Sequence, residues 1–154
     1  MSALLAACGG FLLAVLWMDL IFDVQVLGHR RADGPLPEPV LASIAAYYKR
    51  ATTDSAPMSR LIAVVMGAAV VGSFVHVFTG ANALALRVGA LSLCAAPTGL
   101  AITRIVPNAV RLGARRDDLA RQSALARGIC RDHLVCLVCV AAFVSTELAL
   151  AAGS

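Results

Sequence analysis

Long apolar stretches alternate with polar segments along the chain, and this alternation predicts its main helices. The expected helices cover residues of about 3–25, 61–79, 83–106 and 132–151. An uncharged run over residues 61–86 is divided in two because Thr-Gly-Ala-Asn at 79–82 is typical of a turn. Each stretch approaches the roughly 20 residues that cross about 30 Å of hydrocarbon. We therefore expect four transmembrane helices.

The segment after the first helix carries a further helical pattern at residues 38–51. Its apolar and aromatic positions recur at helical spacing: Val40, Leu41, Ile44, Tyr47 and Tyr48. This pattern predicts an amphipathic helix at the membrane interface, with its tyrosines at headgroup level.

The polar segment before the last helix also favours a helix. Residues 109–128 are rich in Arg and Ala, and Gly128 could end such a helix. Upstream, Pro97 predicts a kink in the third transmembrane helix, and Pro107 discourages its regular continuation.

Composition supports a membrane protein. Hydrophobic residues make up 60% and charged residues 14% of the 154 residues, whereas soluble domains average about 45–50% and about 25%. We expect one all-α membrane domain over 1–154, an antiparallel bundle of four transmembrane helices with a cytoplasmic amphipathic helix in the first loop. The net charge of +4 does not indicate nucleic-acid binding, because no aromatic-basic stripe is present to stack bases.

The distribution of Lys and Arg predicts the orientation. All of them except Arg87 lie in two segments, between the first and second helices and between the third and fourth: Arg30, Arg31, Lys49, Arg50, Arg60, Arg104, Arg111, Arg115, Arg116, Arg121, Arg127 and Arg131. The positive-inside rule makes these loops cytoplasmic. A multi-pass protein of the cell membrane with both termini on the opposite side is expected.

The same orientation gathers polar residues at the cytoplasmic helix ends. We take Asp19, Arg104, Asn108 and His133 as the candidate site, with Asp23 on the same helical face as Asp19. In one interpretation, Asp19 pairs with Arg104 or Arg131 and only locks the helices together. In the other, Asp19 or His133 handles a proton, or less favourably binds a metal, while Arg104 and Asn108 hold an oxyanion or carbonyl.

Other potential sites carry less chemistry. His76, Arg87 and Glu147 lie toward the opposite ends of the helices, where pairing of Glu147 with Arg87 or His76 is the default. Cys136 and Cys139 form a C-x-x-C inside a helix without further zinc ligands. No resident metal and no cofactor are expected.

Two segments, TRIVPNAVRLG and ARGICRDHLVCLVCVAAF, follow in order after a first helix with an acidic end and a long first loop. In this layout the chain resembles the anthrone-oxygenase-like family of small four-helix membrane proteins, with Val106, Pro107, Asn108 and His133 at the matching positions. The resemblance implies a cofactor-free oxygenase acting on a planar, lipophilic phenolic or quinone-like molecule from the bilayer. His133 or Asp19 would be the base, and Asn108 and Arg104 would stabilise the oxyanion.

The residues alone do not decide whether the protein is an enzyme. The alternative is a non-catalytic accessory subunit of a larger membrane complex, for which few polar groups suffice. A transporter would need a second copy to enclose a path. The expected partners are membrane lipids, a lipophilic small molecule, and a membrane protein or second copy of the chain; nucleic acid is not among them.

Overall fold

The computed structural model describes residues 1–29 and 34–153. Its described part contains helices and no strand, which confirms the all-α prediction. The elements in chain order are α1 (Ser2–Asp23), η1 (Val24–His29), α2 (Glu38–Lys49), η2 (Arg50–Asp54), α3 (Ala56–Thr79), α4 (Leu84–Leu100), η3 (Ala101–Ile105), α5 (Val106–Ala114) and α6 (Leu119–Ala152). The predicted contribution of Arg30 and Arg31 to the first basic segment lies outside the described residues.

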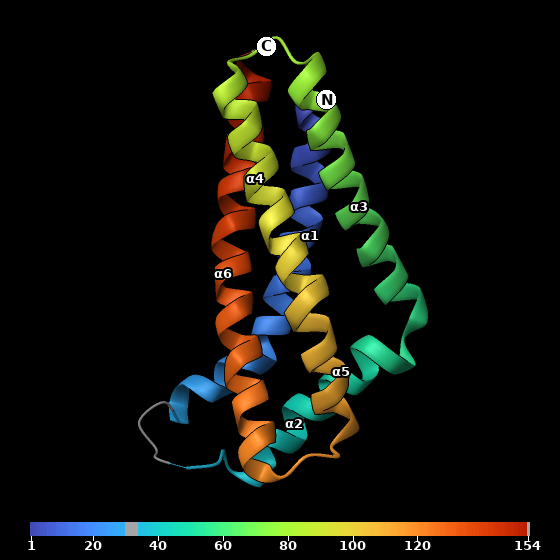
Figure 1. Ribbon diagram of the computed structural model, residues 1–154, viewed down its shortest axis with the longest axis vertical. Coiled ribbons are helices and arrows are strands. Elements are labelled where there is room, and N and C mark those ends of the chain that lie inside the picture. Colours follow the sequence, from blue (N-terminus) through green and yellow to red (C-terminus); the bar gives the residue numbers. More distant parts are fainter. Residues whose placement is uncertain (30–33, 154) are drawn as a thin grey trace.

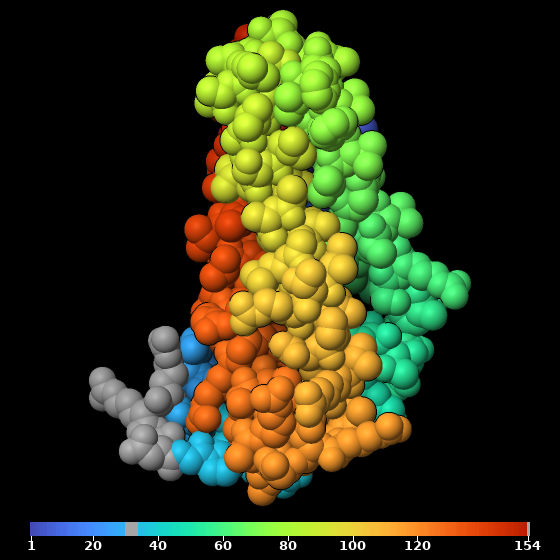
Figure 2. All heavy atoms as spheres, viewed as in Figure 1, coloured from blue at the N-terminus to red at the C-terminus, as the bar shows by residue number. Residues whose placement is uncertain are grey.

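Four helical segments are long and apolar enough to cross a membrane: Ser2–His29, Ala56–Thr79, Leu84–Ala114 and Leu119–Ala152. They lie side by side, with α2 across one end of the group (Figure 1). Only 17–28% of the most apolar part of each is buried inside the molecule, so most of this surface faces outward (Figure 2). These lengths and compositions are those of a multi-pass membrane protein.

The third long helix continues past Pro107, further than its expected end near residue 106. Proline lacks an N–H and crowds the carbonyl four residues earlier. Here the wider π turn of η3 precedes Pro107, which then occupies the first turn of α5. Proline is tolerated in a first helical turn because no intrahelical partner is needed there.

The single helix expected over residues 109–128 is wrong. Arg115 adopts a left-handed conformation (φ 50°) and ends α5. Asp118 then begins α6, its side chain accepting a hydrogen bond from the Arg121 backbone N–H at 2.7 Å. Gly128 lies inside α6 and does not end a helix. The fourth long helix therefore starts before its expected residue 132, at Leu119.

Helix α2 packs against α5, α6 and α1. Its buried face presents Leu41, Ile44 and Tyr48 to a cluster that includes Leu112 of α5 and Ile129 of α6. Tyr48 is only 2% exposed, so its ring packs against the other helices and not against lipid. An amphipathic helix can bury its apolar face against other helices as well as in lipid.

Candidate functional site

Five polar side chains from three elements meet where α2 packs against the C-terminal end of α1 and the first half of α6. We call Asp19 and Asp23 of α1, Tyr47 and Tyr48 of α2, and His133 of α6 the acid–histidine–tyrosine cluster. Asp19 and Asp23 share a face of α1 because they are four residues apart. Neighbouring tyrosines of α2 reach one carboxylate each.

His133 lies between the two carboxylates. Its Nδ1 is 2.6 Å from Asp23 Oδ2, a distance typical of an N–H donated to a carboxylate. The opposite ring nitrogen, Nε2, is 3.7 Å from Asp19 Oδ2, within ion-pair range but too long for a hydrogen bond. Asp23 thus fixes the ring, and Nε2 is the nitrogen that is free to exchange a proton with a third group.

The tyrosines hold the carboxylates in place. The Tyr47 hydroxyl donates to Asp19 Oδ1 at 2.6 Å, and the Tyr48 hydroxyl donates to Asp23 Oδ1 at 2.7 Å. Burial, followed by the nearby carboxylates, raises the pKa of both tyrosines above the usual value near 10. Both hydroxyls therefore remain protonated donors at neutral pH.

The cluster has a buried core and a more open edge. Asp23, Tyr48 and His133 are each at most 4% exposed. Asp19 keeps 16% of its side chain exposed, and Tyr47 stacks on Phe22 with ring centroids 4.2 Å apart. Asp19 and Tyr47 are therefore the members of the cluster nearest the surface.

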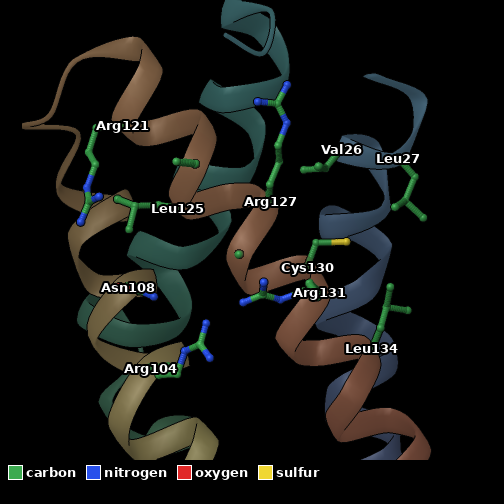
Figure 3. Close-up of a pocket in the computed structure, with 12 residues that line it drawn as sticks. Val26, Leu27, Arg104, Asn108, Arg121, Leu125, Arg127, Cys130, Arg131 and Leu134 are labelled. Carbon is green, nitrogen blue, oxygen red and sulfur yellow. The ribbon is translucent and has the colours of Figure 1, made fainter. Parts of the chain in front are cut away.

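A separate basic cleft of about 600 Å³ lies along the start of α6. Its polar lining consists of Arg104, Asn108, Arg121, Arg127 and Arg131. Figure 3 shows the side chains of Arg104 and Arg131 turned toward one another, between the η3–α5 segment and α6. Apolar side chains of η1 and α6, including Val26, Leu27 and Leu134, complete the lining.

A single buried carboxylate forms ion pairs with both Arg104 and Arg131, the two central arginines of the cleft. Asp132, with 4% of its side chain exposed, has Oδ1 3.1 Å from Arg131 and Oδ2 3.2 Å from Arg104. The Arg131 contact has hydrogen-bond geometry, whereas Asp132 Oδ2 has no hydrogen-bond partner and only the ion pair. Two positive charges thus face one negative charge.

The structure divides the four site residues predicted from the sequence. Asp19 and His133 come together in the acid–histidine–tyrosine cluster, whereas Arg104 and Asn108 line the basic cleft. The sequence reasoning missed Tyr47 and Tyr48 as partners of the carboxylates. Their adjacency on an amphipathic helix was visible, but the path that folds α2 back onto α1 was not.

A second polar group lies toward the turn between α3 and α4. His76 Nδ1 is 3.9 Å from Glu147 Oε2. Arg87 donates to the backbone carbonyls of His76 and Val77. Glu147 is fully buried, and neither of its carboxylate oxygens has a hydrogen-bond partner.

Within residues 1–29 and 34–153, no group of three or more His, Cys, Asp or Glu side chains is arranged to hold a metal ion. No disulfide joins any of the five cysteines, all of which lie in the described part of the chain. No family model matches the chain, and no curated protein and no solved structure shows significant similarity to it.

Proposed function

We propose that this chain is an antiparallel bundle of four transmembrane helices that binds a lipophilic phenolic or quinone-like molecule. The molecule enters from the bilayer and loses a proton to the acid–histidine–tyrosine cluster. In this proposal α2 and the cluster lie at the cytoplasmic face and both termini lie on the other side; the arginine-rich loops support this orientation through the positive-inside rule.

The observation that carries the proposal is the environment of His133. Its Nδ1 is bound to Asp23 at 2.6 Å, while Nε2 faces Asp19 across 3.7 Å without a hydrogen bond. A carboxylate that fixes one ring nitrogen and leaves the other free is an arrangement suited to a general base. Ionisable groups buried within membrane helices also mark functional sites more often than surface charges do.

The chemistry follows from this arrangement. His133 Nε2 accepts a proton from an acidic C–H or O–H of the bound molecule, and Asp19 and Asp23 stabilise the imidazolium. The carbanion or phenolate left behind is electron-rich. In an oxygenase reaction, a CH₂ group and O₂ yield a C=O group and water, so oxygen is the only oxidant needed. The resemblance to the anthrone-oxygenase-like family favours this reaction class.

The Phe22–Tyr47 pair supports an aromatic ligand. The stacked rings lie beside Asp19, at the open edge of the cluster. Phe22 and Tyr47 are both only partly buried, so part of the stacked pair remains at the surface. A planar aromatic molecule is complementary to such a surface.

One observation favours a different function, that of a non-catalytic accessory subunit. Both carboxylates of the cluster already accept hydrogen bonds from tyrosine hydroxyls, so the polar groups have hydrogen-bond partners without a ligand. The cluster would then lock α1, α2 and α6 together, and the outward apolar surface would contact a partner subunit.

The test uses the purified full-length protein in lipid nanodiscs with a panel of phenols, hydroquinones and anthrone-like ketones. We expect oxygen uptake, and a product one oxygen heavier and two hydrogens lighter by mass spectrometry, with at least one compound. His133→Gln and Asp19→Asn should reduce this rate strongly, because they remove the base or its counter-charge. Asp54→Asn, which changes an exposed carboxylate at the end of η2 and outside the cluster, is the matched control.

Any of three results would contradict the enzyme proposal. The first is no turnover above that of protein-free nanodiscs. The others are turnover by the folded His133→Gln variant equal to that of the parent protein, and a loss of turnover in Asp54→Asn as large as in the cluster variants. Melting curves of each variant establish that it is folded. Purification with a stoichiometric partner subunit and without turnover would favour the accessory function instead.

A further inference from the structure

The basic cleft holds more positive charge than its protein partners neutralise. Arg104 and Arg131 converge on the single carboxylate of Asp132. Arg121 adds a third guanidinium to the lining, and no acidic side chain lines the cleft. Arg127 donates to the carbonyl of Gly34 at 3.0 Å, and Figure 3 shows it extending away from Arg104 and Arg131. An anion in the cleft would offset the repulsion between the central arginines.

The donor set defines the anion. Guanidinium groups are planar forks whose N–H pairs match two oxygens of a phosphate group, and an amide supplies a further donor. Arg104, Arg131 and Asn108 present such groups on the two sides of the cleft. Half or more of the side chains of Arg104 and Arg131 remains exposed, so both can reach a ligand without breaking a buried contact.

An apolar groove continues from the cleft along α6. It is lined by Arg131, Leu134, Val135, Val138 and Cys139, and shares Arg131 and Leu134 with the cleft. These positions recur every three or four residues, so they form one stripe on the helix. With a rise of about 1.5 Å per residue, the stripe extends roughly 10 Å from Arg131 to Val138. A soluble phosphate compound has no apolar part to bury against this stripe, whereas a lipid acyl chain would lie along it.

We propose that the basic cleft and the groove together bind one anionic phospholipid. Its phosphate lies between Arg104 and Arg131, and one acyl chain follows Leu134 and Val138 along α6. Basic recesses between transmembrane helices are established places for acidic headgroups. The position fits, because Arg131 lies one helical turn before the apolar run that begins at Leu134, where lipid headgroups are expected. This site is separate from the acid–histidine–tyrosine cluster and does not depend on its function.

Native mass spectrometry of the full-length protein in a neutral detergent tests the proposal. The protein is mixed with phosphatidylglycerol or phosphatidylcholine, and the fraction carrying one lipid is measured. We expect phosphatidylglycerol to be retained preferentially. Arg104→Gln should weaken its binding about fivefold, the effect of one basic side chain near an acidic headgroup. Glycerol phosphate, which has the headgroup chemistry without acyl chains, should not displace it.

Further variants separate a lost site from a lost fold. Arg104→Gln also removes an ion-pair partner of Asp132, so Arg121→Gln tests the cleft without that change. Val138→Asn, at a position that is 69% exposed, tests the groove. Both should weaken phosphatidylglycerol binding. Arg116→Gln removes the same charge from the loop before α6, outside the cleft, and should change nothing.

Each contrary outcome overturns the proposal. Equal retention of phosphatidylcholine shows that the negative charge is not recognised. Displacement by glycerol phosphate shows a soluble phosphate ligand instead of a lipid. Equal weakening by Arg116→Gln, or none by Arg121→Gln and Val138→Asn, shows that binding is not localised to the cleft and groove.

Discussion

Two fully buried carboxylates, Asp23 and Glu147, differ in what surrounds them. Asp23 accepts the Tyr48 hydroxyl and contacts His133 Nδ1. Glu147 has only His76 at 3.9 Å and no hydrogen bond to either oxygen. Burying a charged group is costly unless hydrogen bonds and a counter-charge compensate. The two residues should therefore respond to substitution in opposite ways.

Asp23→Ala should destabilise the protein by about 3 kcal/mol, because it leaves Tyr48 and His133 buried without their partner. Glu147→Gln should instead raise stability by about 1 kcal/mol, since an amide is less costly to bury than an uncompensated carboxylate. Denaturant or thermal unfolding in the same detergent measures both. A Glu147→Gln variant as unstable as Asp23→Ala would contradict this account.

At the scale of elements, the contact between α2 and α5 positions the tyrosines. A Cβ added to Gly113 of α5 would lie 2.9 Å from the Lys49 backbone nitrogen and 3.4 Å from the Tyr48 carbonyl carbon. Glycine thus allows the two backbones to approach closely. The hydroxyl of Tyr48 reaches Asp23 only while α2 keeps this position.

Gly113→Ala should destabilise the protein by about 2 kcal/mol, because backbone atoms of α2 must shift to admit the methyl group. Unfolding measurements and loss of the function of the cluster are the readouts. Gly67→Ala is the matched control: Gly67 is exposed on α3 with nothing within 4 Å of an added Cβ. It should be neutral or stabilising by about 0.5 kcal/mol. Equal effects of the two substitutions would show that the contact does not matter.

For the molecule as a whole, two polar groups lie toward opposite ends of the long helices. The acid–histidine–tyrosine cluster lies beside α2, and the His76–Glu147 pair lies toward the α3–α4 turn (Figure 1). Described arginines of the basic segments lie at the α2 end: Arg115 pairs with Glu38 of α2, and Arg127 donates to the carbonyl of Gly34. In the proposed orientation, the α3–α4 turn is outside the cell and the loop between α5 and α6 is inside.

Labelling with a membrane-impermeant maleimide on intact cells tests this orientation. Ala81→Cys in the α3–α4 turn should react from outside, and Arg116→Cys should react only after permeabilisation. The parent protein controls for its native cysteines, which are buried or half-buried. The reverse pattern would contradict the orientation, and labelling of both positions from one side would contradict the antiparallel arrangement.

What the sequence determined by itself was the helical class and the existence of the long apolar helices. Length, hydropathy and turn residues such as those at 79–82 are local properties, and lipid imposes one solution on an apolar run of this length. The distribution of arginines predicted an orientation, because the positions of basic residues relative to the apolar runs are also read directly from the sequence. The pairing of Asp19 with His133 was within reach, because helix ends on one side of a bundle come together.

Only the tertiary structure decided how the polar side chains are shared. Whether Tyr48 faces lipid or Asp23 depends on where α2 packs, and that depends on the approach of Gly113 to α2. The separation of Arg104 and Asn108 from His133 depends on the path through η3 and α5, which the two prolines did not reveal. These are contacts between segments distant in sequence, and no local pattern specifies them.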